Sequence, residues 1–171
     1  ASKTQTPEII RAAFDGGIRV FGENRVQELT ANNAAGAYEG AKLHFIGHLQ
    51  TNKLKMVLPY VSLIQSVDSL RLLEAINDWG VKNGKVLSLL LEPHVASEET
   101  KQGFSPEDIL DIVSNADRFG AVCFKGLMGM ATFTEDESVI RSDFAKIAAL
   151  RDEILKSFPE RVEDFTELSI G

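Results

Sequence analysis

The sequence predicts an α/β protein built on a parallel sheet, and three observations lead to this prediction. Short apolar runs of strand length alternate with segments whose apolar residues recur at helical spacing. The run at residues 85–91 is strongly apolar, which is typical of a strand buried on both faces of a parallel sheet. No internal repeat or low-complexity linker interrupts the 171 residues, so we expect a single domain.

The first part of the chain is expected to begin with residues 1–4 as the end of a strand. Thr6 can cap the helix that follows, Pro7 suits the first helical position, and Glu8 favours the positive end of the helix dipole. Gly16-Gly17 is predicted to end this helix. We expect further strands at 18–23, 43–47 and 61–66, and helices at about 25–35 and after Thr51 or Asn52.

The second part continues the alternation. Leu70, Leu73, Ile76 and Trp79 lie at helical spacing, and Ser105-Pro106-Glu107-Asp108 is predicted to open another helix. Thr134 and Glu137 are expected to form a capping box for a long helix that reaches Phe158. Strands are expected at 85–91, 121–130 and 168–171, which gives seven strands and six helices in all.

Two architectures fit a parallel sheet with right-handed crossovers: an open doubly wound sheet and a (β/α)₈ barrel. Both place ligands at the carboxyl ends of the strands. No G-x-G-x-x-G motif follows the first strand, which disfavours a dinucleotide-binding protein.

Composition narrows the class of function. The net charge of −7 argues against a non-specific nucleic-acid or anionic-membrane binder, although a small anionic ligand stays compatible with it. The single cysteine, Cys123, allows no intramolecular disulfide and fits a reducing compartment. No apolar run approaches the roughly 18 residues of a membrane span, and no signal-peptide pattern is present. We therefore expect a cytoplasmic protein.

The expected strand ends carry the residues that could do chemistry. They are Lys3, Glu23 and Asn24, Gly47 and His48, Ser66 and Asp68, His94, residues 128–132, and residues 169–171. Lys3 is the one amine among them that could act as a nucleophile, and a lysine forms a Schiff base only as the neutral amine. A lysine near a chain end is more often a solvated surface charge.

Each of the other residues also has an ordinary structural explanation. Asn24 can cap the helix after it, contact a ligand, or do both. The four-residue spacing of His44 and His48 would suit zinc on a helix, but this segment is predicted to be a strand and loop, so we expect no metal site. The ordinary explanations for the rest are helix caps at Asp68 and Ser69, core packing of Met128 and Met130, a solvated loop charge at Lys101, and an inert buried thiol at Cys123.

Several segments, taken in order, resemble one known family. They are Ser2-Lys3-Thr4; Phe21-Gly22-Glu23-Asn24 with Gln27-Glu28; His44-Phe45-Ile46-Gly47-His48-Leu49-Gln50 with Asn52-Lys53; Ser66-Val67-Asp68-Ser69; Glu99-Thr100-Lys101 with Gly103-Phe104; Gly126-Leu127-Met128-Gly129-Met130; and Leu168-Ser169-Ile170-Gly171. Together they resemble the pyridoxal-phosphate homeostasis proteins, which share the barrel of the alanine racemase N-terminal domain. The resemblance covers essentially the whole chain, and the Phe-Gly-Glu-Asn and His-Phe-Ile-Gly segments are its specific part.

The resemblance implies a parallel (β/α)₈ TIM-type barrel that binds pyridoxal 5'-phosphate (PLP), with Lys3 holding the cofactor as a Schiff base. Asn24, Ser66 and Met128 are then candidates for lining the cofactor ring, and Ser169 and Gly171 lie nearest the expected phosphate position. The family implies a role in intracellular PLP (vitamin B6) homeostasis with little or no turnover. Its expected partners are PLP and PLP-dependent apoenzymes, and we expect a monomer when full length, with no nucleic acid and no membrane.

The sequence departs from the family pattern at both ends. The family has a helix and most of a strand before Ser-Lys-Thr, and a final βα unit after Leu-Ser-x-Gly. We therefore expect residues 1–171 to form a single PLP-binding barrel domain with about seven strands, without the N-terminal helix, the eighth strand or the C-terminal βα unit. The absent parts would supply the phosphate cradle and the arginine that faces the pyridine nitrogen. At Glu92-Pro93-His94 the pattern differs as well. The first residue is Ala1 rather than Met, so we expect the natural chain to be longer.

Two enzyme classes are the alternatives. The first is a PLP-dependent amino-acid racemase or decarboxylase, and the second is a cofactor-free Schiff-base aldolase that would also use Lys3. Racemisation by two bases needs an acid–base group on the ring face opposite the lysine. The chain has two tyrosines, Tyr38 and Tyr60, and both are expected at the end of the barrel away from Lys3.

Overall fold

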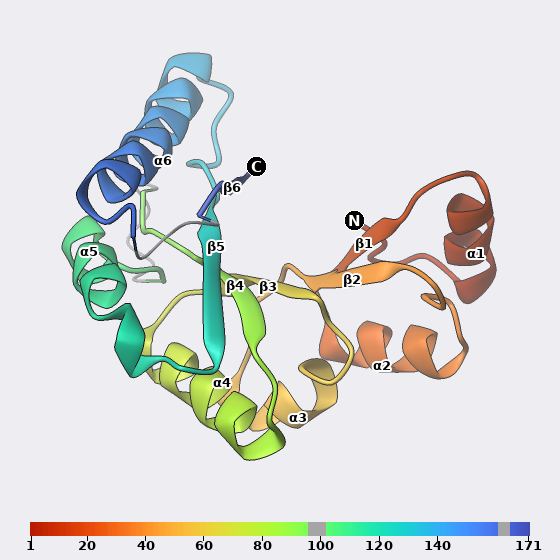
Figure 1. The fold of residues 1–171 in the computed structure, drawn as a ribbon. Coiled ribbons are helices and arrows are strands. Elements are labelled where there is room, and N and C mark those ends of the chain that lie inside the picture. Colours follow the sequence, from red (N-terminus) through yellow and green to blue (C-terminus); the bar gives the residue numbers. More distant parts are fainter. Residues whose placement is uncertain (96–101, 161–164) are drawn as a thin grey trace.

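The computed structural model of the chain describes residues 1–95, 102–160 and 165–171. Six parallel strands form one sheet in the order β1-β2-β3-β4-β5-β6 (Figure 1). Their bounds are β1 Val20–Glu23, β2 Lys42–Phe45, β3 Leu63–Val67, β4 Leu87–Leu91, β5 Val122–Gly129 and β6 Glu167–Ile170. Each strand therefore pairs with the next one in the sequence, as expected for repeated βα units.

The connections between strands are mostly helical. They are α1 Pro7–Asp15, α2 Val26–Ala34, α3 Leu54–Val57, α4 Leu70–Asn83, α5 Pro106–Ser114 and α6 Glu137–Ser157, with short 3₁₀ turns at Thr51–Lys53 and Ala116–Arg118. Thr6 and Ser105 cap α1 and α5 through their hydroxyls, as the sequence predicts. The capping box predicted at Thr134 is wrong: Asp136 caps α6 by accepting from the backbone of Ser138, and Thr134 accepts from Asp136 instead.

The sheet is curved like part of a barrel, with helices on its outer side (Figure 1). One hydrogen bond spans the concave side, from Ser169 Oγ in β6 to Gln65 Oε1 in β3 at 2.7 Å, although these strands are not neighbours in the sheet. A doubly wound sheet would carry helices on both faces, so the barrel-type architecture is the correct one of the two expected. Among the described residues β1 and β6 are the edge strands, and the two chain ends lie on this open side.

The strand expected at residues 1–4 is not formed. One ladder-like hydrogen bond is present, from the Ser2 backbone N–H to the Gly22 carbonyl at 2.9 Å. The chain then turns at Thr4, whose φ of 66° is incompatible with a strand. Residues 1–4 therefore lie beside β1 without extending the sheet, and the described residues hold six strands rather than seven.

The core lies between the outer face of the sheet and the helices. It consists of fully buried aliphatic and aromatic side chains, which include Phe45, Ile64, Leu73, Leu89 and Ile147. The concave face carries polar side chains instead, because alternate residues of each strand point to opposite faces. Among the described residues, no helix is long and apolar enough to cross a bilayer.

Candidate functional site

Parallel pairing brings the carboxyl ends of all six strands to one edge of the curved sheet, which we call the ligand edge. Lys3 lies at this edge next to the end of β1, because Ser2 is bonded to β1. The Lys3 side chain is exposed, whereas Ser2 is buried. Lys3 therefore lies beside the end of β1, although residues 1–4 do not form the strand that was expected to carry it.

A buried carboxylate anchors the segment before Lys3. Glu23, at the end of β1, is fully buried, and its Oε1 accepts from Ser2 Oγ at 2.8 Å and from the Tyr38 hydroxyl at 2.5 Å. Burial, together with the hydrogen bond and charge of Glu23, raises the pKa of Tyr38 well above its usual value. The expected position of Tyr38 is therefore wrong: its hydroxyl reaches the ligand edge, two hydrogen bonds from the residue next to Lys3.

Asn24 follows Glu23, and its backbone passes very close to Gly47. A Cβ at Gly47 would lie 2.1 Å from the Asn24 backbone oxygen, so only glycine fits between these two chain segments. Asn24 does not cap α2, whose N-cap is Arg25 without a side-chain bond. Asn24 Oδ1 and Glu23 Oε2 are buried and have no hydrogen-bond partner among the described residues. Such atoms are rare, which makes this pair of acceptors a feature of the site.

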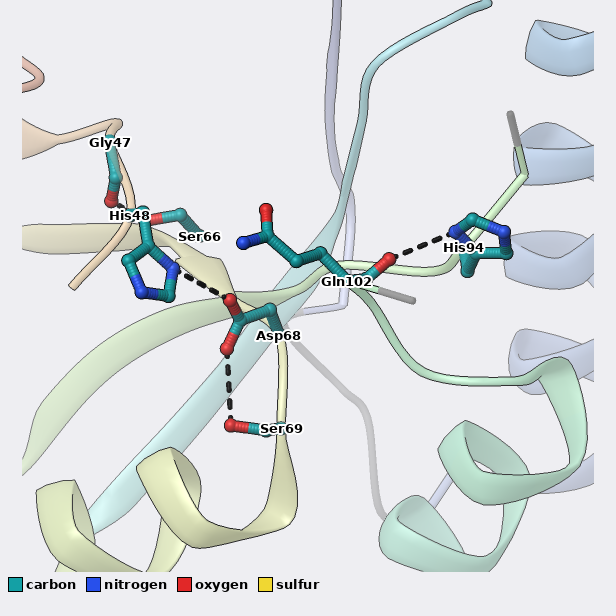
Figure 2. Close-up of polar contacts among 7 residues, drawn as sticks. All are labelled: Gly47, His48, Ser66, Asp68, Ser69, His94 and Gln102. Atoms are coloured by element: carbon teal, nitrogen blue, oxygen red, sulfur yellow. Dashed lines mark hydrogen bonds and ion pairs between the residues drawn. The ribbon is translucent and has the colours of Figure 1, made fainter. Parts of the chain in front are cut away.

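The ends of β2 and β3 are joined by side chains (Figure 2). The buried Ser66 donates its hydroxyl hydrogen to the Gly47 carbonyl, and His48 Nδ1 lies 3.0 Å from Asp68 Oδ2. Ser69 is the N-cap residue of α4, as expected, but its hydroxyl makes no capping bond: Ser69 Oγ donates to Asp68 Oδ1 at 3.1 Å. A cavity of about 400 Å³ beside this pair is lined by His48, Asp68 and Arg71 among others, but not by Lys3 or Asn24.

Glu92 follows β4 and lies close to Asp68 and His48. Burial raises the pKa of the Glu92 carboxyl, and the negative charge of Asp68 raises it further, while His48 lowers it; the result is a pKa of about 7. Glu92 therefore changes charge near neutral pH at the ligand edge. Sequence reasoning did not single out this property, because it depends on residues that are 24 and 44 positions earlier in the chain.

A chain of polar side chains crosses the concave face below Ser169. Gln65 accepts from Ser169 through Oε1 and places Nε2 at 3.0 Å from His44 Nδ1. Burial lowers the pKa of His44, the charge of Lys42 lowers it further, and Glu167 acts in the opposite sense. A neutral His44 accepts the Gln65 amide proton, so Gln65 is fixed in the orientation that receives Ser169.

The remaining predicted residues differ in their surroundings. Met128 is buried, as expected, whereas Met130 is 60% exposed, so the expectation of core packing is wrong for Met130. Gly171 exchanges backbone bonds with the end of β5, through Gly129 and Ala131. Cys123 lies in β5 and is half-buried rather than buried. Lys101, with Glu99 and Thr100, lies outside the described residues.

Comparison with known proteins supports this fold. Residues 1–163 match the family described as alanine racemase, N-terminal domain. An alanine racemase from Clostridium difficile has the same fold, with a TM-score of 0.70 at 12% identity over 97% of this chain and 43% of that one. The class is thus the alanine racemase type of α/β barrel.

More similar proteins specify the family. The pyridoxal phosphate homeostasis protein of Aquifex aeolicus is 38% identical over 92% of this chain and 69% of its own length. PipY of Synechococcus elongatus without PLP gives a TM-score of 0.91 at 30% identity, covering 99% of this chain and 79% of that one, and a structure of PipY with PLP bound gives 0.87 at 28%, covering 98% and 77%. The chain belongs to the pyridoxal phosphate homeostasis protein family.

Proposed function

We propose that this chain binds PLP through Lys3 and serves intracellular PLP (vitamin B6) homeostasis, with little or no catalytic turnover. The observation that carries the proposal is the exposed side chain of Lys3 at the ligand edge, next to Ser2, which is anchored on β1. The homologous PipY has been solved with PLP bound, which supports the same cofactor here. The proposed location is the cytoplasm, the proposed state of the full-length protein is a monomer, and PLP-dependent apoenzymes are the proposed recipients.

The residues at the ligand edge fit this cofactor. PLP supplies an aldehyde that an amine can capture, a ring with hydrogen-bonding groups, and a phosphate. Lys3 offers the amine, and Asn24 is half-buried with an acceptor that lacks a partner among the described residues. Ser169, whose hydroxyl donates to Gln65, lies in β6 two residues before Gly171. We propose that Asn24, Ser66 and Met128 line the ring, and that Ser169 and Gly171 lie toward the phosphate.

The test is covalent trapping on the 171-residue chain. After incubation with PLP we expect a visible absorbance band. After subsequent reduction with borohydride we expect a pyridoxyl group on Lys3 in peptide mass spectra. Lys3→Ala should remove both, because it removes the amine proposed to capture the aldehyde. Lys82→Ala, which changes an exposed lysine on α4, is the matched control and should keep both. An adduct wholly on another lysine would refute the assignment, and the absence of any visible band would favour the cofactor-free aldolase.

We expect racemisation of free alanine to be absent or very slow. A second acid–base group is needed opposite Lys3. Tyr38 is buried and bonded to Glu23, and its raised pKa makes it a poor proton donor or acceptor near neutral pH. Tyr60 lies between α3 and β3, where strands begin rather than end. The measurement is chiral chromatography of L-alanine incubated with the PLP-loaded chain, and robust formation of D-alanine would favour the racemase class instead.

A further inference from the structure

The two residues that flank Lys3 are each held by a glutamate from residues 21–28. On one side, Ser2 Oγ donates to Glu23 Oε1 at 2.8 Å. On the other side, the backbone N–H of Thr4 donates to Glu28 Oε2, also at 2.8 Å. The backbone of Lys3 is therefore anchored at both neighbours while its side chain is exposed.

Thr4 is the residue that needs this support. Its φ is 66°, and it is the one non-glycine residue with positive φ in the described part of the chain. A β-branched side chain in the left-handed region is a true outlier, and it persists only where the surroundings hold it. The Thr4 hydroxyl donates to the Lys3 carbonyl at 2.6 Å, and the Thr4 backbone N–H donates to the Glu28 carboxylate. The turn that presents Lys3 thus depends on Glu28.

Glu28 is itself fixed by local structure. It lies in the first turn of α2, where the helix dipole favours a carboxylate. Its Oε1 pairs with Arg25 Nη1 at 3.2 Å, which leaves Oε2 for Thr4, and the Glu28 side chain is 25% exposed. The carboxylate is therefore held in place before it meets Thr4.

We propose that Glu28 is a positioning residue that keeps Thr4 in the left-handed conformation and thereby directs the Lys3 amine to the ligand edge. This inference rests on the proposed function, since Lys3 is taken as the residue that captures PLP. An amine held in one place loses less conformational freedom on binding, and it meets an aldehyde in a more constant geometry. Glu28 acts through Thr4 and does not need to touch the cofactor.

The test compares three substitutions of Glu28 by PLP affinity and by the rate at which the visible band appears. Glu28→Ala removes the acceptor, and Glu28→Asp keeps the charge but withdraws the oxygen from Thr4. Both should weaken PLP binding about tenfold, the effect of losing one hydrogen bond to a charged group. Glu28→Gln keeps an oxygen at the same distance and should bind nearly as the unsubstituted chain does. Arg25→Ala, the matched control, removes the ion pair of Glu28 but keeps the Glu28 bond to Thr4, and should weaken PLP binding much less than Glu28→Asp does.

A charge effect without positioning would give the reverse order, with Asp retaining and Gln losing affinity, and would overturn the inference. Affinity and rate equal to those of the unsubstituted chain in all three variants would overturn it as well.

Adding Thr4→Gly to Glu28→Asp should recover part of the lost affinity, because glycine takes positive φ without strain. Melting curves show whether a loss of PLP affinity comes from unfolding of the variant. If Glu28→Ala does not fold, the comparison of Glu28→Asp with Glu28→Gln tests the inference. Absence of a Lys3 adduct in the unsubstituted chain would refute the proposed function, whereas a normal Lys3 adduct together with unchanged PLP affinity and unchanged band rate in Glu28→Asp would refute this inference alone.

Discussion

Gly47→Ala is expected to lower the free energy of unfolding by about 3 kcal/mol, at the upper end of the usual cost of overpacking. The new Cβ would lie 2.1 Å from the Asn24 backbone oxygen and 2.7 Å from its Cα. Backbone atoms cannot rotate away as a flexible side chain can, so the β1 and β2 ends must separate. Asn24, which directly follows β1 at the ligand edge, would then be displaced. We therefore expect weaker PLP binding together with a melting temperature lower by roughly 10 °C.

Gly120→Ala is the matched control for this experiment. Gly120 is exposed before β5, its φ is not in the left-handed region, and a Cβ there would meet no atom within 4 Å. We expect a change in stability within about 0.5 kcal/mol and unchanged PLP binding. Chemical denaturation and PLP titration of both variants provide the comparison. A Gly47→Ala variant as stable as Gly120→Ala would show that the two strand ends are not packed as closely as the structure places them.

Local sequence patterns were sufficient to predict most of the fold. The apolar run at 85–91 contains β4, and α5 begins at the predicted Ser105-Pro106-Glu107-Asp108 segment, because both depend on neighbours within a few residues. Thr134 shows where this approach fails. Two possible capping residues lie within three positions: the carboxylate of Asp136 accepts from the Ser138 N–H of α6, and Thr134 Oγ1 accepts from the Asp136 N–H. The sequence pattern alone does not determine which of the two residues caps α6.

The candidate site was harder to predict, because its contacts join distant parts of the chain. Lys3 was found from its place before the first helix, and the resemblance supported it. The partners that fix it were not found: Glu23 is 21 residues from Ser2, and Glu28 is 24 residues from Thr4. The bond from Ser169 to Gln65 spans 104 residues and depends on the curvature of the sheet. Glu23 in the Phe-Gly-Glu-Asn segment and Glu28 shortly after it could have been noted as acceptors, but their donors follow only from the way the chain folds back beside β1.

The stability of the chain is expected to fall by about 2 kcal/mol as the pH rises from 4.5 to 8, and Glu92→Gln should abolish this fall. The carboxyl of Glu92 has a pKa of about 7 in the folded chain, against an ordinary value of 4.5. Between these two values the folded state binds more protons than the unfolded state, so the free energy of unfolding decreases with pH, and the whole cost is present above pH 7. If the Glu92 carboxyl were fully shielded from water, the fall in the free energy of unfolding would be about 3 kcal/mol, and the partial exposure of the Glu92 side chain reduces it.

Urea denaturation at several pH values from 5 to 8.5 would measure the effect. At pH 8, Glu92→Gln should be about 2 kcal/mol more stable than the unsubstituted chain, because its neutral amide avoids the burial of a charge beside Asp68. Asp68→Asn should shift the transition to lower pH, because it removes the repulsion that raises the Glu92 pKa, although it also breaks the pair with His48. Glu74→Gln, which changes an exposed carboxyl on α4, should keep the normal pH dependence. If Glu92→Gln and the unsubstituted chain lose stability equally between pH 5 and 8, another group causes the change.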